Sequence, residues 1–147
     1  MHPLAPAEVE SLLSEHLPAA DRHGEVIEAI TPGCLRMRLP MRDAFLSRDL
    51  PPGSGQAVVS APLMMGLADT AMYAAIHAFY GRDAFGAIIS MTTSFLRVAP
   101  ATDLIAEVSV VKKGRKLAFL ETSISGLGSD AVCARVTASY AVWRARG

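Results

Sequence analysis

The sequence is organised around residues 60–80, SAPLMMGLADTAMYAAIHAFY, in which a single formally charged side chain, Asp69, lies near the middle. The remaining residues leave no wide polar face, which is typical of a helix that is buried nearly all round. Ser60 is suited to cap this helix, Pro62 is tolerated in its first turn, and Gly81 ends it. A lone carboxylate on a buried helix costs free energy unless it is paired or used. Asp69 is therefore the first candidate functional residue.

The composition indicates one domain that associates with copies of itself. The chain has 147 residues, enough for one domain with its own core. Hydrophobic residues make up 51% of it and charged residues only 19%, which favours a large buried interface and predicts a homo-oligomer. We expect a dimer, or a dimer of dimers. With 14 basic and 14 acidic residues the formal net charge is zero, which argues against nucleic acid as a partner.

Nothing in the sequence predicts export, a membrane anchor or a metal. The first 17 residues are acidic and lack a basic start before an apolar run, so they do not form a secretory signal. Residues 61–80 are long enough to span a bilayer, but Asp69 at mid-depth argues against that interpretation. Cys34 and Cys133 have no partners at ligand spacing and are interpreted as reduced thiols of a cytoplasmic protein. The histidines also lack metal-ligand spacing.

The order of elements predicts an α+β fold. A short amphipathic helix is expected over 5–18, strands flank the Pro32-Gly33 turn, and residues 41–56 are expected to form a loop. Four further strands are predicted after the central helix, over 87–97, 103–111, 117–125 and 131–143. The simplest cover for a buried helix is a curved antiparallel sheet wrapped around it, and a free sheet edge invites pairing with a second copy. We expect residues 1–23 to form a helix and lead-in, and residues 24–147 a single domain.

Three segments resemble a known family. VVSAPLMMGLADTAMYAA, TTSFLRVAPATDLIAEVSVVKKGRKLAFLETSI and AVCARVTASYAV are similar to hotdog-fold acyl-CoA thioesterases of the phenylacetate-pathway (PaaI-like) type. The most specific matches are Leu67-Ala68-Asp69, Phe95-Leu96-Arg97 and Gly114-Arg115, and the resemblance covers roughly residues 24–143. It implies a hotdog fold and hydrolysis of a small or medium acyl or aryl thioester. Coenzyme A would be part of the substrate, so no separate cofactor is expected.

The resemblance also implies roles for individual residues at the central helix. Asp69 takes the position of the general base or nucleophile, and the family's His-Gly-Gly maps onto Ser60-Ala61-Pro62. Ala61 keeps the backbone N–H that polarises the thioester carbonyl, whereas Pro62 has none. The alternative is a structural Asp69, bonded to a neighbouring backbone amide or to a partner chain.

The resemblance also gives candidates for the residues that position water. The candidates are Ser54, with Gln56 close to it, and Ser90, which lies two residues after the counted position Ile88 and is expected to point the same way. In a hotdog dimer, the site would face the partner chain.

A basic turn is the candidate site for the phosphates of coenzyme A. Lys113, Gly114, Arg115 and Lys116 belong to this turn, and Arg97 is expected to help. A solvated turn with no ligand is the alternative interpretation.

Two other functions stay open at this point. One is an acyl-CoA-binding module without catalysis. The other is a hotdog hydratase or dehydratase, which would need a histidine where Ser60 stands. No Gly-x-Ser-x-Gly elbow and no phosphate-binding glycine motif occurs, so a serine hydrolase and nucleotide chemistry are unsupported.

Overall fold

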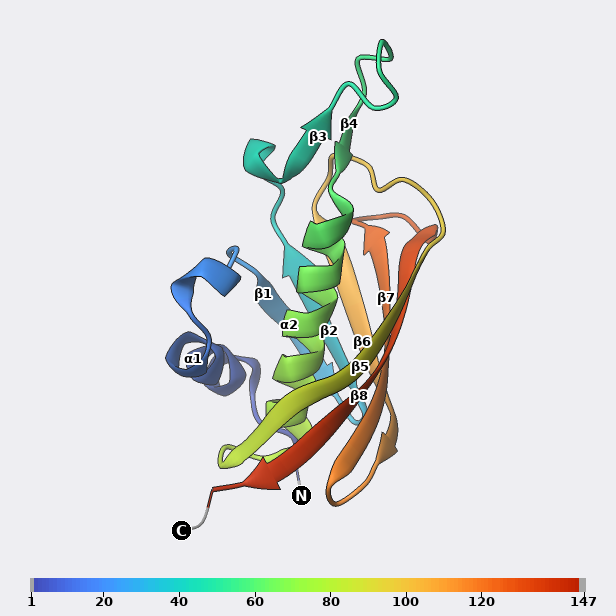
Figure 1. Cartoon of the computed structure of the whole chain (residues 1–147). Coiled ribbons are helices and arrows are strands. Elements are labelled where there is room, and N and C mark those ends of the chain that lie inside the picture. Colours follow the sequence, from blue (N-terminus) through green and yellow to red (C-terminus); the bar gives the residue numbers. More distant parts are fainter. Residues whose placement is uncertain (1, 146–147) are drawn as a thin grey trace.

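The computed structural model describes residues 2–145 and has one long helix lying against a curved antiparallel sheet (Figure 1). The elements in chain order are α1 (Pro6–His16), η1 (Ala19–Asp21), β1 (Val26–Thr31), β2 (Cys34–Leu39), η2 (Asp43–Phe45), β3 (Leu46–Arg48), β4 (Ala57–Val59), α2 (Ala61–Tyr80), β5 (Ala84–Phe95), β6 (Leu104–Lys113), β7 (Leu117–Gly126) and β8 (Val132–Arg144). The predicted α+β class, with a sheet around a central helix and a short N-terminal helix, is confirmed.

The main sheet has six strands in the order β1-β2-β6-β7-β8-β5, all antiparallel to their neighbours. β6, β7 and β8 form its centre, while β1 and β5 are its two edges. Residues 41–56, expected to be a loop, contain β3, and this strand pairs with β4 in a separate hairpin. Figure 1 shows this hairpin projecting beyond the N-terminal end of α2.

Helix α2 begins and ends as its sequence predicts. The Ser60 hydroxyl accepts a hydrogen bond from the Leu63 backbone N–H at 3.3 Å, which satisfies one of the free donors of the first turn. At the other end Gly81 adopts φ 108°, a left-handed conformation that favours glycine, and its N–H bonds the His77 carbonyl.

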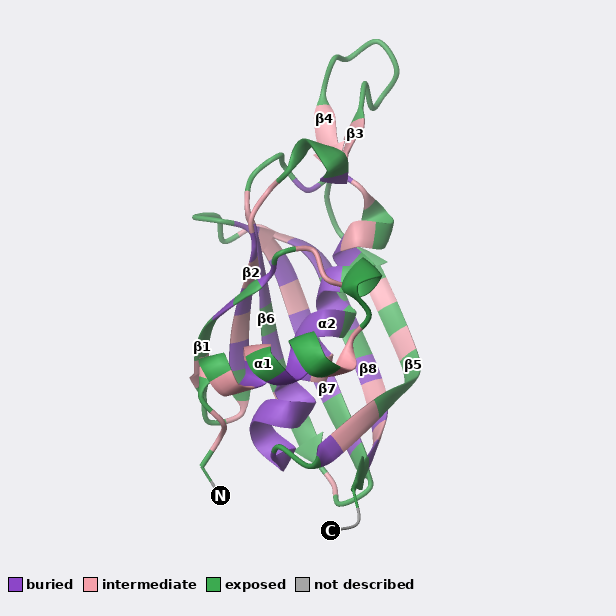
Figure 2. Cartoon of the chain, turned by 90° about the vertical axis from the view of Figure 1, so that its left-hand side faces the viewer, coloured by how far each residue is buried: buried purple, intermediate pink, exposed green. Residues whose placement is uncertain are grey.

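The prediction that α2 is buried all round is correct only for its second half. Figure 2 shows that the second half of α2 is buried, and every residue from Ala74 to Tyr80 is buried. In the first half, Met65, Gly66 and Asp69 are exposed. These three residues lie at helical spacing on one face. The sheet therefore covers one side of α2, and part of the opposite side is left open in the single chain.

Helix α1 closes part of the face of α2 that the sheet leaves free. Val9 and Leu13 are fully buried, and the Leu4 backbone N–H donates to the Ala78 carbonyl at 3.0 Å. The Glu10 carboxylate accepts a hydrogen bond from the backbone N–H of Ile27 at 2.7 Å, which ties α1 to β1. The N-terminal segment is thus packed against the rest of the chain.

His77 lies in the contact between the two helices and is completely buried. Its Nε2 is 3.4 Å from His16 Nδ1, and its ring meets Tyr73 edge to face. Burial, together with the nearby His16, lowers the pKa of His77 to about 4. No helix between residues 2 and 145 combines the length and the apolar character that a membrane crossing requires.

The buried His77 predicts a pH-dependent stability. The unfolded chain binds a proton on this histidine near pH 6.5, whereas the folded chain resists it until about pH 4. The free energy of unfolding should therefore fall as the pH drops through this window, by up to about 1.4 kcal/mol per pH unit. Urea unfolding between pH 7.5 and pH 4 measures it, and His77→Leu should flatten the slope. Ile76→Val is the packing control, which lowers stability but keeps the slope; an unchanged slope in His77→Leu would contradict the prediction.

Candidate active site

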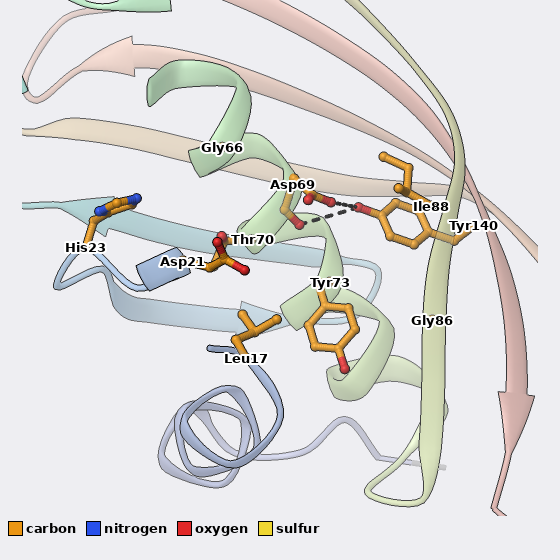
Figure 3. A pocket seen from close by; sticks show the side chains of 10 residues that line it. All are labelled: Leu17, Asp21, His23, Gly66, Asp69, Thr70, Tyr73, Gly86, Ile88 and Tyr140. Carbon is orange, nitrogen blue, oxygen red and sulfur yellow. Dashed lines mark hydrogen bonds between the residues drawn. The ribbon is translucent and has the colours of Figure 1, made fainter. Parts of the chain in front are cut away.

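Asp69 lies in a surface pocket beside α2. The pocket has a volume of about 340 Å³ and includes Leu17 and Ile88 as apolar walls. The other residues that line it are Asp21, His23, Gly66, Asp69, Thr70, Tyr73, Gly86 and Tyr140 (Figure 3). We expected the Asp69 carboxylate to be enclosed on all sides, but the side chain is exposed in the single chain. The reason is that the sheet covers α2 from one side only.

A buried tyrosine holds the Asp69 carboxylate. The Tyr140 hydroxyl on β8 donates a hydrogen bond to Asp69 Oδ1 at 2.6 Å (Figure 3). Tyr140 is 1% exposed. Burial raises the pKa of its hydroxyl far above the usual value, and the negative charge of Asp69 raises it further. Tyr140 is therefore a permanent donor to this carboxylate.

A β-bulge decides which residue of β5 faces the pocket. Ile88 pairs with Tyr140 and Ser90 pairs with Ser139, so the register shifts between Ile88 and Ser90. Ser90 was expected to point the same way as Ile88, but the extra residue reverses the alternation. The Ser90 hydroxyl lies 2.8 Å from the Ser139 hydroxyl, and both residues line a different surface pocket. Ile88 lines the Asp69 pocket of this chain, whereas Ser90 does not.

The N-terminus of α2 carries Ser60, Ala61 and Pro62. The Ser60 side chain is used as the helix cap, which gives it a structural role. The Ala61 N–H has no hydrogen-bond partner among residues 2–145 and lies at the positive end of the helix dipole. Eight residues separate Ala61 from Asp69. At 1.5 Å per residue this is about 12 Å along the helix, so one chain does not bring the two groups to the same carbonyl.

Ser54 and Gln56 lie in the turn of the β3–β4 hairpin. Both are exposed, and the Ser54 hydroxyl accepts a hydrogen bond from the Gln56 backbone N–H at 3.1 Å. Neither residue lines the Asp69 pocket of the same chain. Their assignment as water-positioning residues stays a prediction.

The basic turn and Arg97 lie at opposite ends of the sheet. Arg97 Nε donates to the Val132 carbonyl at the start of β8, whereas Lys116 accepts from Val142 near its end. About 30 Å of strand separates these two points. The expectation that Arg97 helps the turn to hold one ligand is therefore wrong for a single chain.

The turn itself has a well-defined conformation. A side chain at Gly114 would place its Cβ 2.5 Å from the Leu117 carbonyl oxygen, so this position requires glycine. The Gly114 carbonyl accepts a hydrogen bond from Tyr80 at 2.6 Å, and Lys113 lies over the Tyr80 ring. Arg115 and Lys116 are exposed. These contacts hold the turn against Tyr80 and leave its cations exposed, and their binding of coenzyme A stays a prediction.

Sequence reasoning missed Tyr140, Asp21 and His23 as pocket residues. All three are distant from Asp69 in the sequence, and no spacing pattern links them to it. The alternation of β8 indicates only that Tyr140 faces the covered side of the sheet. Among the described residues no group of three or more His, Cys, Asp or Glu side chains is placed to hold a metal ion.

The family comparison decides the broader identity of the chain. The model for the acyl-CoA thioesterase N-terminal domain matches residues 55–141, which is more than half of the sequence. The chain belongs to this acyl-CoA thioesterase family. It is therefore a thioester hydrolase, with acyl-CoA thioesterase activity in general. None of the curated proteins compared with it matches its sequence.

Solved structures with the same fold include several thioesterases. A putative thioesterase from Silicibacter sp. is 26% identical with a TM-score of 0.79, and the match covers 95% of this chain and 92% of the other. A thioesterase from Haemophilus influenzae is 15% identical with a TM-score of 0.78, covering 96% and 92%. A putative thioesterase from Ralstonia eutropha, described as related to phenylacetic acid degradation, is 24% identical with a TM-score of 0.71, covering 91% and 98%. This acyl-CoA thioesterase thus shares its fold with them over nearly its whole length.

The contribution of the Ser60 cap to stability can be tested by substitution. Ser60→Ala removes the acceptor for the Leu63 N–H and should lower the free energy of unfolding by about 1 kcal/mol. Ser60→Asp keeps a capping oxygen and should retain most of the stability. Chemical denaturation measures both variants. Equal stability of Ser60→Ala and the wild type would contradict the capping role.

Proposed function

We propose that the enzyme hydrolyses small or medium acyl or aryl thioesters of coenzyme A, with Asp69 as general base or nucleophile. With Asp69 as base, water attacks the thioester carbonyl carbon while its proton passes to the carboxylate. The Ala61 N–H stabilises the negative oxygen of the intermediate. The carbon–sulfur bond then breaks, and the thiolate of coenzyme A leaves and takes up the proton. With Asp69 as nucleophile, a mixed anhydride forms first and water then cleaves it.

The observation that carries this proposal is an ionisable carboxylate in a pocket that also offers apolar surface. Asp69 is the acid of the helix, and the Tyr140 hydroxyl fixes one of its oxygens. Leu17, Ile88 and the ring of Tyr73 supply apolar surface for an acyl or aryl group. The family match supports the reaction class independently.

The separation of the two catalytic groups supports a site built from two copies of the chain. Asp69 and the Ala61 N–H are about 12 Å apart along one rigid helix, whereas a single carbonyl must approach both within about 3–4 Å. Both groups lie on the part of α2 that the sheet leaves uncovered. In a two-fold dimer, Asp69 of one copy meets Ala61 of the other, which gives two equivalent sites.

The edge strand β5 provides the surface for such a dimer. It is twelve residues long, pairs with β8 on one side only, and exposes Ile89 and Phe95. A long free edge with apolar side chains favours pairing with another strand. Because β5 also contributes Ile88 to the Asp69 pocket, pairing there would bring a second copy to the site. A dimer of two such dimers is a further part of the proposal.

Several finer features complete the proposal. The basic turn at Lys113–Lys116 is proposed to bind the phosphates of coenzyme A, as its exposed cations support. The PaaI-like subtype is supported by the resemblance of residues 24–143. A cytoplasmic location is supported by the free Cys34 and Cys133.

Replacement of the acid tests the proposed mechanism. Asp69→Asn keeps the size of the side chain and removes its basicity, so kcat for a panel of acyl-CoA thioesters should fall by about 10²–10⁴-fold. Release of free thiol measures the rate. Asp130→Asn, an exposed acid in the β7–β8 turn, is the control and should keep wild-type rates. Wild-type turnover by Asp69→Asn would exclude the mechanism, and binding of acyl-CoA without turnover by the wild type would favour the non-catalytic module.

Mixing two inactive variants tests the two-copy site. Ala61→Pro removes only the N–H, because proline fits the first helical position and Ser60 already has the extended conformation required before it (φ −66°, ψ 142°). Ala61→Pro and Asp69→Asn should each be nearly inactive alone. After subunit exchange, activity should return to about a quarter of the wild-type value, since half of the dimers are mixed and each has one intact site. A site within one chain would give no recovery.

A further inference from the structure

Tyr140 connects the sheet to the acid of the proposed site. It lies in β8 between β7 and β5, paired with Ala118 and Ile88, and its ring is buried beneath α2. Its hydroxyl lies 2.6 Å from Asp69 Oδ1 and 3.4 Å from the Asp69 carbonyl oxygen. A hydroxyl has one proton to donate, and the shorter contact to a carboxylate is the stronger bond.

The surroundings of the ring fix the direction of this hydroxyl. A Cβ at Gly86 of β5 would lie 3.4 Å from Tyr140 Cδ1 and 3.1 Å from the Ile76 side chain. Glycine at this position leaves the room that the ring occupies. The tyrosine is thus packed from β5 and from α2, and its hydroxyl reaches Asp69 as Figure 3 shows.

The hydrogen bond from Tyr140 makes the two carboxylate oxygens of Asp69 inequivalent. Oδ1 accepts from Tyr140, whereas Oδ2 has no hydrogen-bond partner among residues 2–145. A helical aspartate has several rotamers, and an exposed one is free to change between them. The tyrosine hydroxyl selects the rotamer in which Oδ1 is held and Oδ2 stays available.

We infer that Tyr140 is a positioning residue for thioester hydrolysis: its hydroxyl holds the Asp69 carboxylate in one orientation and leaves Oδ2 for water or substrate. This inference rests on the proposed role of Asp69 and assigns a partner to it. The competing explanation is a purely structural bond that fastens α2 to β8. The two differ in what happens to the reaction when the bond is removed and the packing is kept.

Tyr140→Phe distinguishes the positioning role from the purely structural one, because it keeps the ring and removes only the hydrogen-bond donor. If Tyr140 positions Asp69, kcat should fall by about tenfold with KM changed less than about threefold, since orientation is lost and the pocket walls remain.

A core variant of reduced stability controls for a structural effect. Ile124 of β7 is fully buried and does not line the Asp69 pocket, so Ile124→Val loosens the core elsewhere. It should keep the wild-type kcat and KM. If Tyr140→Phe also keeps both, or if Ile124→Val shows the same changes, the positioning role is overturned.

A crystal structure of Tyr140→Phe separates this inference from the proposed function. The Asp69 side chain should adopt a second rotamer or become disordered while the fold is unchanged. If the wild type fails to hydrolyse any acyl-CoA tested, the proposed function fails, and the rotamer still decides whether Tyr140 orients Asp69. An Asp69 side chain in the wild-type rotamer would overturn the inference.

Discussion

The burial of α2 against one concave face of a sheet is the constraint on which the rest of the structure depends. The second half of the helix, from Ala74 to Tyr80, is apolar enough to be enclosed completely by the sheet and α1. The first half is covered by the sheet on one side only, so Met65, Gly66 and Asp69 stay open. A single six-stranded sheet does not surround a helix of this length. The open face is where the acid lies, and it is also where a second copy would complete the enclosure.

The sheet determines the site as much as the helix does. The bulge between Ile88 and Ser90 turns an apolar residue toward Asp69 and a serine away from it. Gly86 leaves room for the Tyr140 ring, and the hydroxyl of that buried ring donates a hydrogen bond to the Asp69 carboxylate. The local chemistry at Asp69 is therefore a carboxylate held by a neutral donor, beside the apolar surface of Ile88. That combination suits a reaction in which a proton is taken from water next to an uncharged acyl group.

The geometry of one helix explains why this enzyme is proposed to act as an oligomer. The Ala61 N–H and the Asp69 carboxylate are placed by the same rigid element and cannot approach each other. Two-fold symmetry solves this without any change of shape, because it sets the start of one helix beside the middle of another. The free β5 edge supplies an extended surface for that association, with Ile89 exposed on it. Catalysis and association would then depend on the same uncovered face.

The sequence alone determined the order of the helices and of the main-sheet strands, without the β3–β4 hairpin. It also determined the helix over Ala61–Tyr80 with its Ser60 cap and Gly81 end, and showed that Asp69 is the one formally charged side chain on this helix. These features follow from local rules: hydrophobic periodicity, capping chemistry and the isolation of one charge. Only the tertiary structure decided that Asp69 is exposed, that Ser90 faces away from it and that Tyr140 holds it. A bulge shifts the alternation of a strand without a reliable sequence signal, and a contact between residues 71 positions apart is set by packing. Local patterns specify which elements form, whereas the meeting of side chains across them depends on how the sheet curves around the helix.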